Sequence, residues 1–305
     1  MTPPVILYSY DFSPYAQKIR LLLTAAKIPF SICDQPPVLP RPDLQSLGIH
    51  YRRIPLLAVG KDVYCDTTAI VDVIQKELGG LPESAADRAY EAFGREVFWS
   101  CLAAVPGAML SGEFVKDRET IFPVLSRPDL ATIRPSALAE FRAVLTTISH
   151  DFLGPKRPTS GPFIHGPNLS LADIHVAWVT RWMLRDLGLG QEAGFTATDF
   201  PAVHRWIEAL PPDAPAARVS GSEAAALILG SGAATTVVVA GGLEPLRELG
   251  IEEGTEVGVE STDSKPGSHP QHGELVGLDG VEVVVRTVKG VRLHFPRRGY
   301  VVKKR

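Results

Sequence analysis

A serine at the start of a helix is the first residue of the chain whose type and place suggest chemistry. The apolar run Val5–Tyr8 is followed by a polar turn that ends in Ser13-Pro14. Serine is a good N-cap, and proline suits the first helical position because an N–H there would have no helical partner. Unpaired N–H groups and the helix dipole favour an anion at this place, and a thiolate held there would have a lowered pKa. Ser13 therefore either helps to hold a thiolate or only caps the helix.

A strand and a helix must position this turn. The run Val5–Tyr8 has the length of a strand, and the residues after the turn repeat at helical spacing: Ile19, Leu22, Leu23 and Ala26. Residues 1–80 continue with turn signals that separate a strand, a short helix, a hairpin and a capped helix. We expect these elements at Phe30–Cys33, 43–47, 52–57, Val63–Cys65 (after a Gly60–Asp62 turn) and from Asp66-Thr67 to Gly79-Gly80.

The middle of the chain is predicted to be helical and its end to be β-rich. Helical periodicity covers 88–110, 136–153 and 201–210, and Ser170 with Asp173 forms a capping box before another helix. A proline-rich linker at 211–215 leads to a short helix at 222–229 and to 233–240, which fits a strand or a loop. Asp-Gly and Lys-Gly turns then separate five short strands that suggest a small curled sheet or barrel: 256–260, 274–278, 281–287, 291–295 and 300–302.

Composition limits the classes of function. A 305-residue chain with 45% hydrophobic and 21% charged residues is typical of a globular protein with two or three domains. The net charge of −3 gives no reason to expect nucleic acid or an anionic membrane as partner. We expect no signal peptide or spanning helix, and three scattered cysteines favour the cytosol. The eight histidines have no metal-ligand spacing, so no metal is expected.

The C-terminal end is locally basic. It is either a docking face for an anionic partner or the solvated face of a small sheet. From Val281 on, Glu282 is the single acidic residue beside eight basic ones: Arg286, Lys289, Arg292, Arg297, Arg298, Lys303, Lys304 and Arg305.

Four separate motifs make residues 1–210 resemble the glutathione S-transferase superfamily. They are F-S-P-Y at 12–15, R-R-I-P-L-L at 52–57, C-D-T-T-A-I at 65–70 and L-S-L-A-D-I at 169–174. The serine turn is most similar to serine-type classes such as plant tau, whereas C-D-T and the added β segment resemble fungal relatives. The resemblance implies a thioredoxin-like α/β domain at 1–80 and an all-α domain at 87–211, followed by an additional β-rich, barrel-like domain at 219–305.

The resemblance also implies a glutathione site. Pro55 matches the family's cis-proline, which would turn the backbone of Ile54 toward the cysteinyl part of glutathione. Thr67 would bind the γ-glutamyl carboxylate at a helix start and Asp66 would face the ammonium, while Arg53 would meet the glycyl carboxylate. The alternatives are an ordinary trans proline, a plain Asp-Thr cap and a solvated pair of arginines, Arg52 and Arg53.

Ser13 indicates the type of reaction within this resemblance. Its hydroxyl would stabilise the glutathione thiolate, and without a cysteine there no mixed disulfide with the enzyme can form, which disfavours thiol-transferase activity. Three nearby hydroxyls are rivals: Tyr8, which fits the core of the strand, and Tyr10 and Tyr15, which fit the site.

The remaining expectations concern substrate and assembly. A hydrophobic electrophile would meet an apolar wall formed by Tyr10, Phe12 and Trp99, although aromatic residues on helices are more often core. The reaction would be transfer or a glutathione-dependent isomerisation, and a non-catalytic binding or scaffold protein is the alternative, since a fold does not fix a function. Relatives are usually dimers, so a homodimer is expected.

Overall fold

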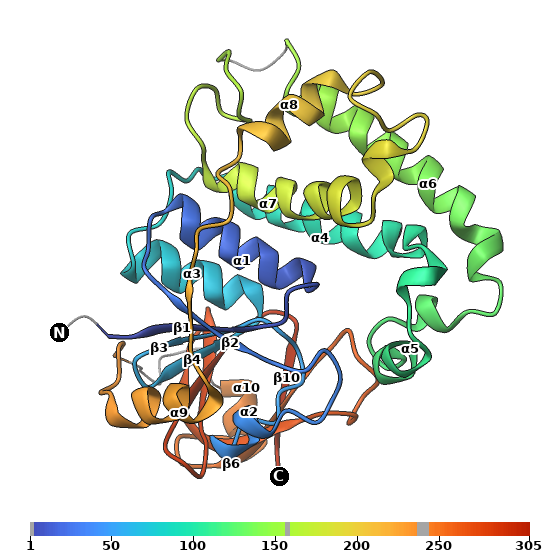
Figure 1. Cartoon of the computed structure of the whole chain (residues 1–305). Helices are drawn as coiled ribbons and strands as arrows, with labels where there is room; N and C mark the ends of the chain where they lie inside the picture. The colour runs from blue at the N-terminus through green and yellow to red at the C-terminus, as the bar shows by residue number, and fades with distance from the viewer. Residues whose placement is uncertain (1–2, 156–158, 237–243) are drawn as a thin grey trace. The chain divides into compact units, whose positions relative to one another are not determined.

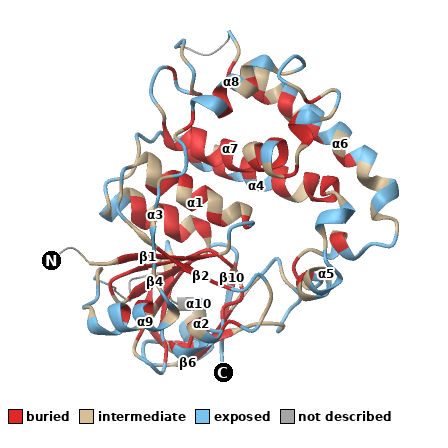
Figure 2. Ribbon diagram, in the orientation of Figure 1, coloured by how far each residue is buried: buried red, intermediate tan, exposed pale blue. Residues whose placement is uncertain are grey.

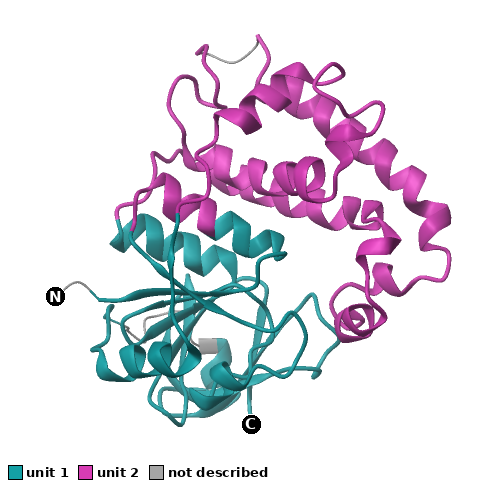
Figure 3. Cartoon of the chain, viewed as in Figure 1, with its two compact units in different colours: residues 1–19, 29–78, 215–305 teal, residues 20–28, 79–214 magenta. Residues whose placement is uncertain are grey.

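The computed structural model describes residues 3–155, 159–236 and 244–305. The chain divides into two compact units (Figure 3). Residues 1–19, 29–78 and 215–305 form the first unit, and residues 20–28 and 79–214 form the second. The C-terminal strands thus share a unit with the N-terminal segment. The domain boundaries at 1–80, 87–211 and 219–305 stay a prediction from the sequence.

The N-terminal part of the first unit is a thioredoxin-like α/β segment (Figure 1). In the sheet, β1 lies between β2, to which it is parallel, and β3, to which it is antiparallel, and β3 forms a hairpin with β4. Helix α3 packs on β3 and β4. The elements are β1 Val5–Ser9, α1 Pro14–Ala25, β2 Ser31–Asp34, α2 Pro42–Ser46, β3 Leu56–Val59, β4 Asp62–Cys65 and α3 Thr67–Glu77.

Five C-terminal strands extend this sheet. We call residues 256–304 the β module. Its strands follow one another as antiparallel neighbours, except that β10 returns to pair with β6, and β9 then pairs in parallel with β4. The result is one ten-stranded sheet in the order β10-β6-β7-β8-β9-β4-β3-β1-β2-β5. The additional elements are β5 Ala217–Arg218, α9 Gly221–Gly230, α10 Glu244–Arg247, β6 Glu256–Ser261, β7 Gln271–Leu278, β8 Glu282–Arg286, β9 Arg292–Pro296 and β10 Tyr300–Lys304.

A single hydrophobic core lies under both parts of this sheet. Leu56 and Ala58 of the N-terminal segment belong to the same buried cluster as Val283, Leu293 and Phe295 of the β module. All five side chains are fully buried. Figure 2 shows the strands of the sheet as mostly buried. Because apolar burial is the main favourable term in folding, the β module and the N-terminal segment stabilise each other.

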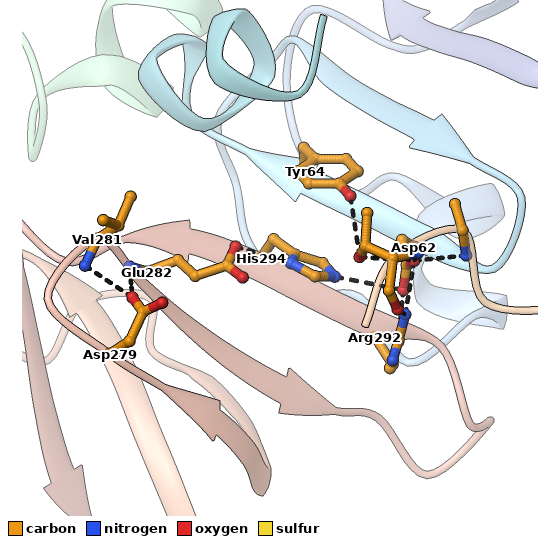
Figure 4. A network of polar contacts seen from close by, with 9 residues as sticks. Asp62, Tyr64, Asp279, Val281, Glu282, Arg292 and His294 are labelled. Atoms are coloured by element: carbon orange, nitrogen blue, oxygen red, sulfur yellow. Dashed lines mark hydrogen bonds and ion pairs between the residues drawn. The ribbon is translucent and has the colours of Figure 1, made fainter. Parts of the chain in front are cut away.

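A buried charge network joins β4 to β9 (Figure 4). The carboxylate of Asp62 accepts two bonds from the Arg292 guanidinium, at 2.5 and 2.7 Å, and lies 3.2 Å from Nε2 of His294. Nδ1 of His294 lies 2.9 Å from the Glu282 carboxylate, and the imidazole stacks on the ring of Tyr64. Asp62 and His294 are fully buried, so the partners must replace the water that each charge loses.

The pKa values of this network follow from opposing effects. Burial by itself would lower the pKa of His294, but the carboxylates of Asp62 and Glu282 raise it above its ordinary value. Burial would raise the pKa of Asp62, but bonds from His294 and Arg292 hold it well below its ordinary value. The geometry therefore favours a protonated imidazolium between two carboxylates.

The second unit is helical. Its helices are joined by short 3₁₀ and π turns at 102–104, 107–109, 123–126, 148–152, 182–186 and 189–191. No helix in the described part of the chain is long and apolar enough to cross a membrane. The α-helices are α4 Asp87–Cys101, α5 Gly112–Arg118, α6 Leu130–Thr147, α7 Leu171–Arg181 and α8 Pro201–Ala209.

The predicted capping box is present at the start of α7. Oδ2 of Asp173 accepts bonds from the backbone N–H and the hydroxyl of Ser170, at 3.0 and 2.8 Å. Its Oδ1 accepts bonds from the Ile164 N–H and from the Trp206 indole, at 2.8 and 2.9 Å. Asp173 is fully buried, and it holds three separate segments of the helical unit together.

Most of the predicted elements are confirmed, including the five C-terminal strands. Helix α6 is an exception, because it begins at Leu130 and contains Pro135, whereas the sequence favoured a start at Ser136. A proline inside a helix removes one hydrogen bond, but burial of Phe141 and Leu145 on the same helix outweighs that loss. The predicted helix 88–110 becomes 3₁₀ turns after Cys101. The segment 233–240 lies partly outside the described residues.

Candidate functional site

Three segments singled out in the sequence meet at one edge of the sheet. Tyr8 of β1 pairs with Leu56 of β3, so the turn after β1 and the residues before β3 lie at the same end. Leu56 also pairs with Cys65 of β4, so the residues after β4 lie there too. This register brings the Ser13 turn, Ile54-Pro55 and Asp66-Thr67 to one edge of the first unit.

Ser13 caps helix α1. Its hydroxyl oxygen accepts a bond of 3.2 Å from the Ala16 N–H, which leaves the hydroxyl proton for an acceptor outside the helix. The residue is 2% exposed. Ser13 thus has the geometry of an N-cap, and the same geometry directs a donor to the positive end of the helix.

Pro55 and Ile54 lie at the start of β3. The Ile54–Pro55 peptide bond is cis, as predicted, and Ile54 belongs to the buried core. The preceding Arg53 is not a solvated residue, because its side chain is 21% exposed and forms a fork with the Asp263 carboxylate. The two bonds measure 2.5 and 3.1 Å, and a third runs to the Ser264 hydroxyl at 2.7 Å.

Asp66 and Thr67 lie at the start of α3. Oδ1 of Asp66 accepts a 2.9 Å bond from the Thr68 N–H, which makes Asp66 the N-cap. Its backbone has φ +75°. Residues other than glycine seldom adopt a positive φ, and those that do are concentrated at functional sites. Thr67 is buried at the first position of the helix. Asp66 is thus the N-cap and Thr67 the first residue of α3, and their role in binding an anion stays a prediction.

The β module contributes two residues that the sequence did not single out. The Tyr300 hydroxyl donates to Oδ2 of Asp66 at 3.0 Å and lies 2.7 Å from the Tyr51 hydroxyl. Burial is the largest reason that the pKa values of both tyrosines lie well above the ordinary value, so both stay neutral. Together with Asp263 on Arg53, the β module thus contacts the predicted site at two points.

The rival hydroxyls differ in exposure. Tyr8 is fully buried, and burial holds its pKa above the ordinary value, as expected for a core residue. Tyr10 is half-buried against the core.

Of the predicted apolar wall, Phe12 is 39% exposed. Trp99 belongs to the helical unit, where its ring contacts Phe98 and Phe122. A role for Tyr10, Phe12 and Trp99 in binding an electrophile stays a prediction.

The three cysteines are buried thiols. Burial raises the pKa of Cys33 and Cys101 to about 11 each and raises that of Cys65. Because the thiolate is the reactive form, these side chains act as small apolar groups.

A cavity of about 370 Å³ opens between residues 39–51 and 268–272 of the first unit, and His50, His269 and His272 line it. Nε2 of His269 lies 2.9 Å from the Arg52 guanidinium, and burial together with this charge lowers the pKa of the imidazole. Within the described residues no group of histidine, cysteine or acidic side chains has the arrangement of a metal site.

Three of the eight basic residues near the C-terminus pair with acidic side chains. Arg286 binds Glu274, Arg292 binds Asp62, and Lys303 binds Glu260. Both interpretations of the run, a solvated face of the sheet and a docking face for an anionic partner, stay predictions.

The sheet order and the positions of the helices define a thioredoxin-like fold. Residues 7–81 match the family model described as the N-terminal domain of glutathione S-transferase, so the chain carries that domain. Residues 103–218 match a model described as a domain of unknown function. The comparison with curated proteins returns no match.

A solved structure with the same fold covers the whole chain. A GST-like protein from Pseudomonas syringae is 21% identical, with a TM-score of 0.66 and complete coverage of both chains. The shared fold therefore includes the C-terminal strands. A glutathione transferase from Burkholderia graminis, with two glutathione molecules bound per subunit, is 18% identical (TM-score 0.49, 68% of this chain and 82% of that chain). A tau class enzyme from mango, Mangifera indica, is 17% identical (TM-score 0.48, 74% and 98%).

Proposed function

We propose that the chain binds glutathione at the sheet edge and activates its thiolate for attack on a hydrophobic electrophile. The observation that carries the proposal is the convergence of the Ser13 turn, Ile54-Pro55 and Asp66-Thr67, which strand register alone brings together. The Ser13 hydroxyl would donate to the glutathione sulfur, and the start of α1 would stabilise the negative charge. Cytoplasmic location, a homodimer and the absence of nucleic-acid or membrane partners belong to the same proposal.

Recognition of the γ-glutamyl end would depend on the start of α3. N–H groups at a helix start bind carboxylates, and the Thr67 hydroxyl would add a further donor. Asp66 carries a carboxylate that would face the ligand's ammonium. The backbone N–H and C=O of Ile54 would form hydrogen bonds with the cysteinyl part of glutathione, because each residue carries one backbone donor and one acceptor.

Calorimetric titration with glutathione tests the site. We expect a Kd in the micromolar to millimolar range, or roughly −8 to −4 kcal/mol. Thr67→Val should weaken binding about tenfold, which corresponds to one hydrogen bond to a charged group, whereas Thr67→Ser keeps the hydroxyl and should bind as the wild type does. Equal affinity of the valine variant would remove Thr67 from the site.

A non-catalytic glutathione-binding protein is the second candidate. It is favoured by the low exposure of Ser13, whose oxygen already caps α1. Glutathione binding without turnover of a chloronitrobenzene, in the wild type and in Ser13→Ala alike, would favour this candidate. A glutathione-dependent isomerase would need the same bound thiolate, and an isomerisable substrate would distinguish it from a transferase.

A further inference from the structure

The β module places a carboxylate on the arginine that would receive the glycyl carboxylate of glutathione. Oδ1 and Oδ2 of Asp263 accept bonds from both terminal nitrogens of Arg53, which is the bidentate geometry of an arginine–carboxylate pair. The Ser264 hydroxyl accepts a further bond from one of these nitrogens. The two terminal nitrogens of the guanidinium, which can bind a carboxylate in this bidentate way, are therefore already used within the chain.

The loop that carries Asp263 is fixed in place. Ser261, where strand β6 ends, pairs with Tyr300 at the start of β10, and the Thr262 N–H bonds to the Gly299 carbonyl at 2.9 Å. The Ser261 hydroxyl donates to Asp263. Asp263 and Tyr300 thus lie at one corner of the β module, and this corner contacts both Arg53 and Asp66.

The charges of the pair agree with this geometry. Burial would raise the pKa of Asp263, but its bonds to Arg53 lower it below the ordinary value. Asp263 is therefore an anion at neutral pH. Its side chain is 45% exposed, whereas that of Arg53 is 21% exposed, so water can replace Arg53 around the aspartate when a ligand carboxylate competes for the guanidinium.

We propose that Asp263 sets the ligand specificity of this site, because it occupies on Arg53 the place of the glycyl carboxylate and so disfavours a thiol with a free carboxylate at that end. The preferred ligands are thiols of the glutathione type in which this carboxylate is capped or missing. This inference rests on the proposed function. A glycyl carboxylate that binds Arg53 must displace the Asp263 carboxylate or lie close to it. Two carboxylates that lie close together repel each other.

The experiment compares glutathione with its glycyl ethyl ester, which lacks that charge, in calorimetric titrations of the full chain. In the wild type we expect the ester to bind at least as tightly as glutathione. In Asp263→Asn the Kd for glutathione should fall about 10- to 150-fold, the range of a hydrogen bond to a charged group. The Kd for the ester should change less than twofold, so the ratio of the two Kd values should shift toward glutathione.

The control is Glu274→Gln, which removes another half-exposed carboxylate of the β module that is paired with an arginine, Arg286. It should leave both affinities as in the wild type. Equal gains for both thiols, or none for glutathione, in Asp263→Asn would overturn the inference and leave the proposed function standing. If neither glutathione nor its ethyl ester binds to the wild type or to Asp263→Asn, the proposed function is overturned, and this inference with it.

Discussion

Ser13 is the residue on which the proposed chemistry depends. A hydroxyl that donates to a thiolate stabilises it by roughly 1.5 to 3 kcal/mol, so Ser13→Ala should lower the turnover of a chloronitrobenzene by about 10- to 150-fold. The pKa of the bound thiol should rise at the same time, because the charged form loses its donor. Steady-state kinetics and the ultraviolet absorbance of the thiolate against pH measure the two effects.

Tyr10 and Tyr15 provide the matched controls, since each carries a nearby hydroxyl on the same turn or helix. Tyr10→Phe and Tyr15→Phe should keep the thiol pKa of the wild type. If one of them raises this pKa and Ser13→Ala does not, that tyrosine is the donor and Ser13 is a helix cap.

At the scale of single elements, the start of α7 depends on Asp173. Its carboxylate accepts four bonds at a fully buried position, and removal leaves buried donors without their acceptor. Asp173→Ala should therefore cost several kcal/mol of unfolding free energy, a large part of a typical total of about 5 to 15. Urea unfolding followed by tryptophan fluorescence reports this loss.

Asp199 is the control for this prediction. Its Oδ2 accepts three bonds in a similar local turn, from the Gly194 and Thr196 N–H groups and the Thr196 hydroxyl, but at an exposed position. Water can replace the lost acceptor there, so Asp199→Ala should unfold at nearly the urea concentration of the wild type. Similar losses for the two variants would mean that burial does not determine the importance of the cap.

The junction of β4 and β9 should respond to pH through His294. A group whose pKa is raised in the folded protein stabilises it below the unfolded pKa, and this stabilisation is lost as pH rises through the folded value. The pKa of His294 is raised above 6.5, so His294→Gln should lose more unfolding free energy at about pH 5.5 than at about pH 8.5. Asp62 remains ionised at both pH values because its pKa is lowered.

Urea titrations at several pH values measure this difference for the wild type and the variant. His272→Gln, at an exposed position of the β module, should follow the wild type throughout. A loss in His294→Gln that stays constant or grows with pH would contradict a protonated imidazole in the junction.

At the scale of the whole molecule, what the sequence could predict is what short-range patterns encode. Helical periodicity and the capping box predicted α7, and turn residues predicted the strands of the β module. The pairing of β4 with β9 has no such signal, because Asp62 and Arg292 are 230 positions apart and parallel strands need no shared turn. Asp62 was predicted to be part of a turn, yet it is fully buried at this junction.

The candidate site also contains residues that local motifs predict and residues that they do not. Ser13, Pro55 and Asp66 follow from local motifs, since each marks a turn or a helix start. Asp263 and Tyr300 lie more than 200 positions from their partners Arg53 and Asp66. Within the chain, Tyr300 belongs to an aromatic and basic stretch and Asp263 to a polar turn, and neither pattern indicates a partner.

The shared core makes cooperative unfolding of the first unit the final prediction. Phe295 of β9 is fully buried, and its ring packs edge-to-face against the ring of Tyr51 of the N-terminal segment, with 5.4 Å between the ring centroids. Phe295→Ala should cost about 3 to 5 kcal/mol, as large-to-small changes in cores do. Because β3 and β4 share this core, amide exchange should accelerate in 56–65 together with 282–296.

Hydrogen exchange with mass spectrometry resolves these peptides, and the four tryptophans (Trp99, Trp178, Trp182 and Trp206) report separately on the helical unit, which holds all of them. Val288→Ala is the control, since this side chain of the β module is 92% exposed and should change no peptide. Faster exchange confined to 282–296 would mean that the β module opens alone. In that case Asp263 and Tyr300 could leave Arg53 and Asp66 without any unfolding of the glutathione S-transferase N-terminal domain, and ligand affinity would depend on how often the module opens.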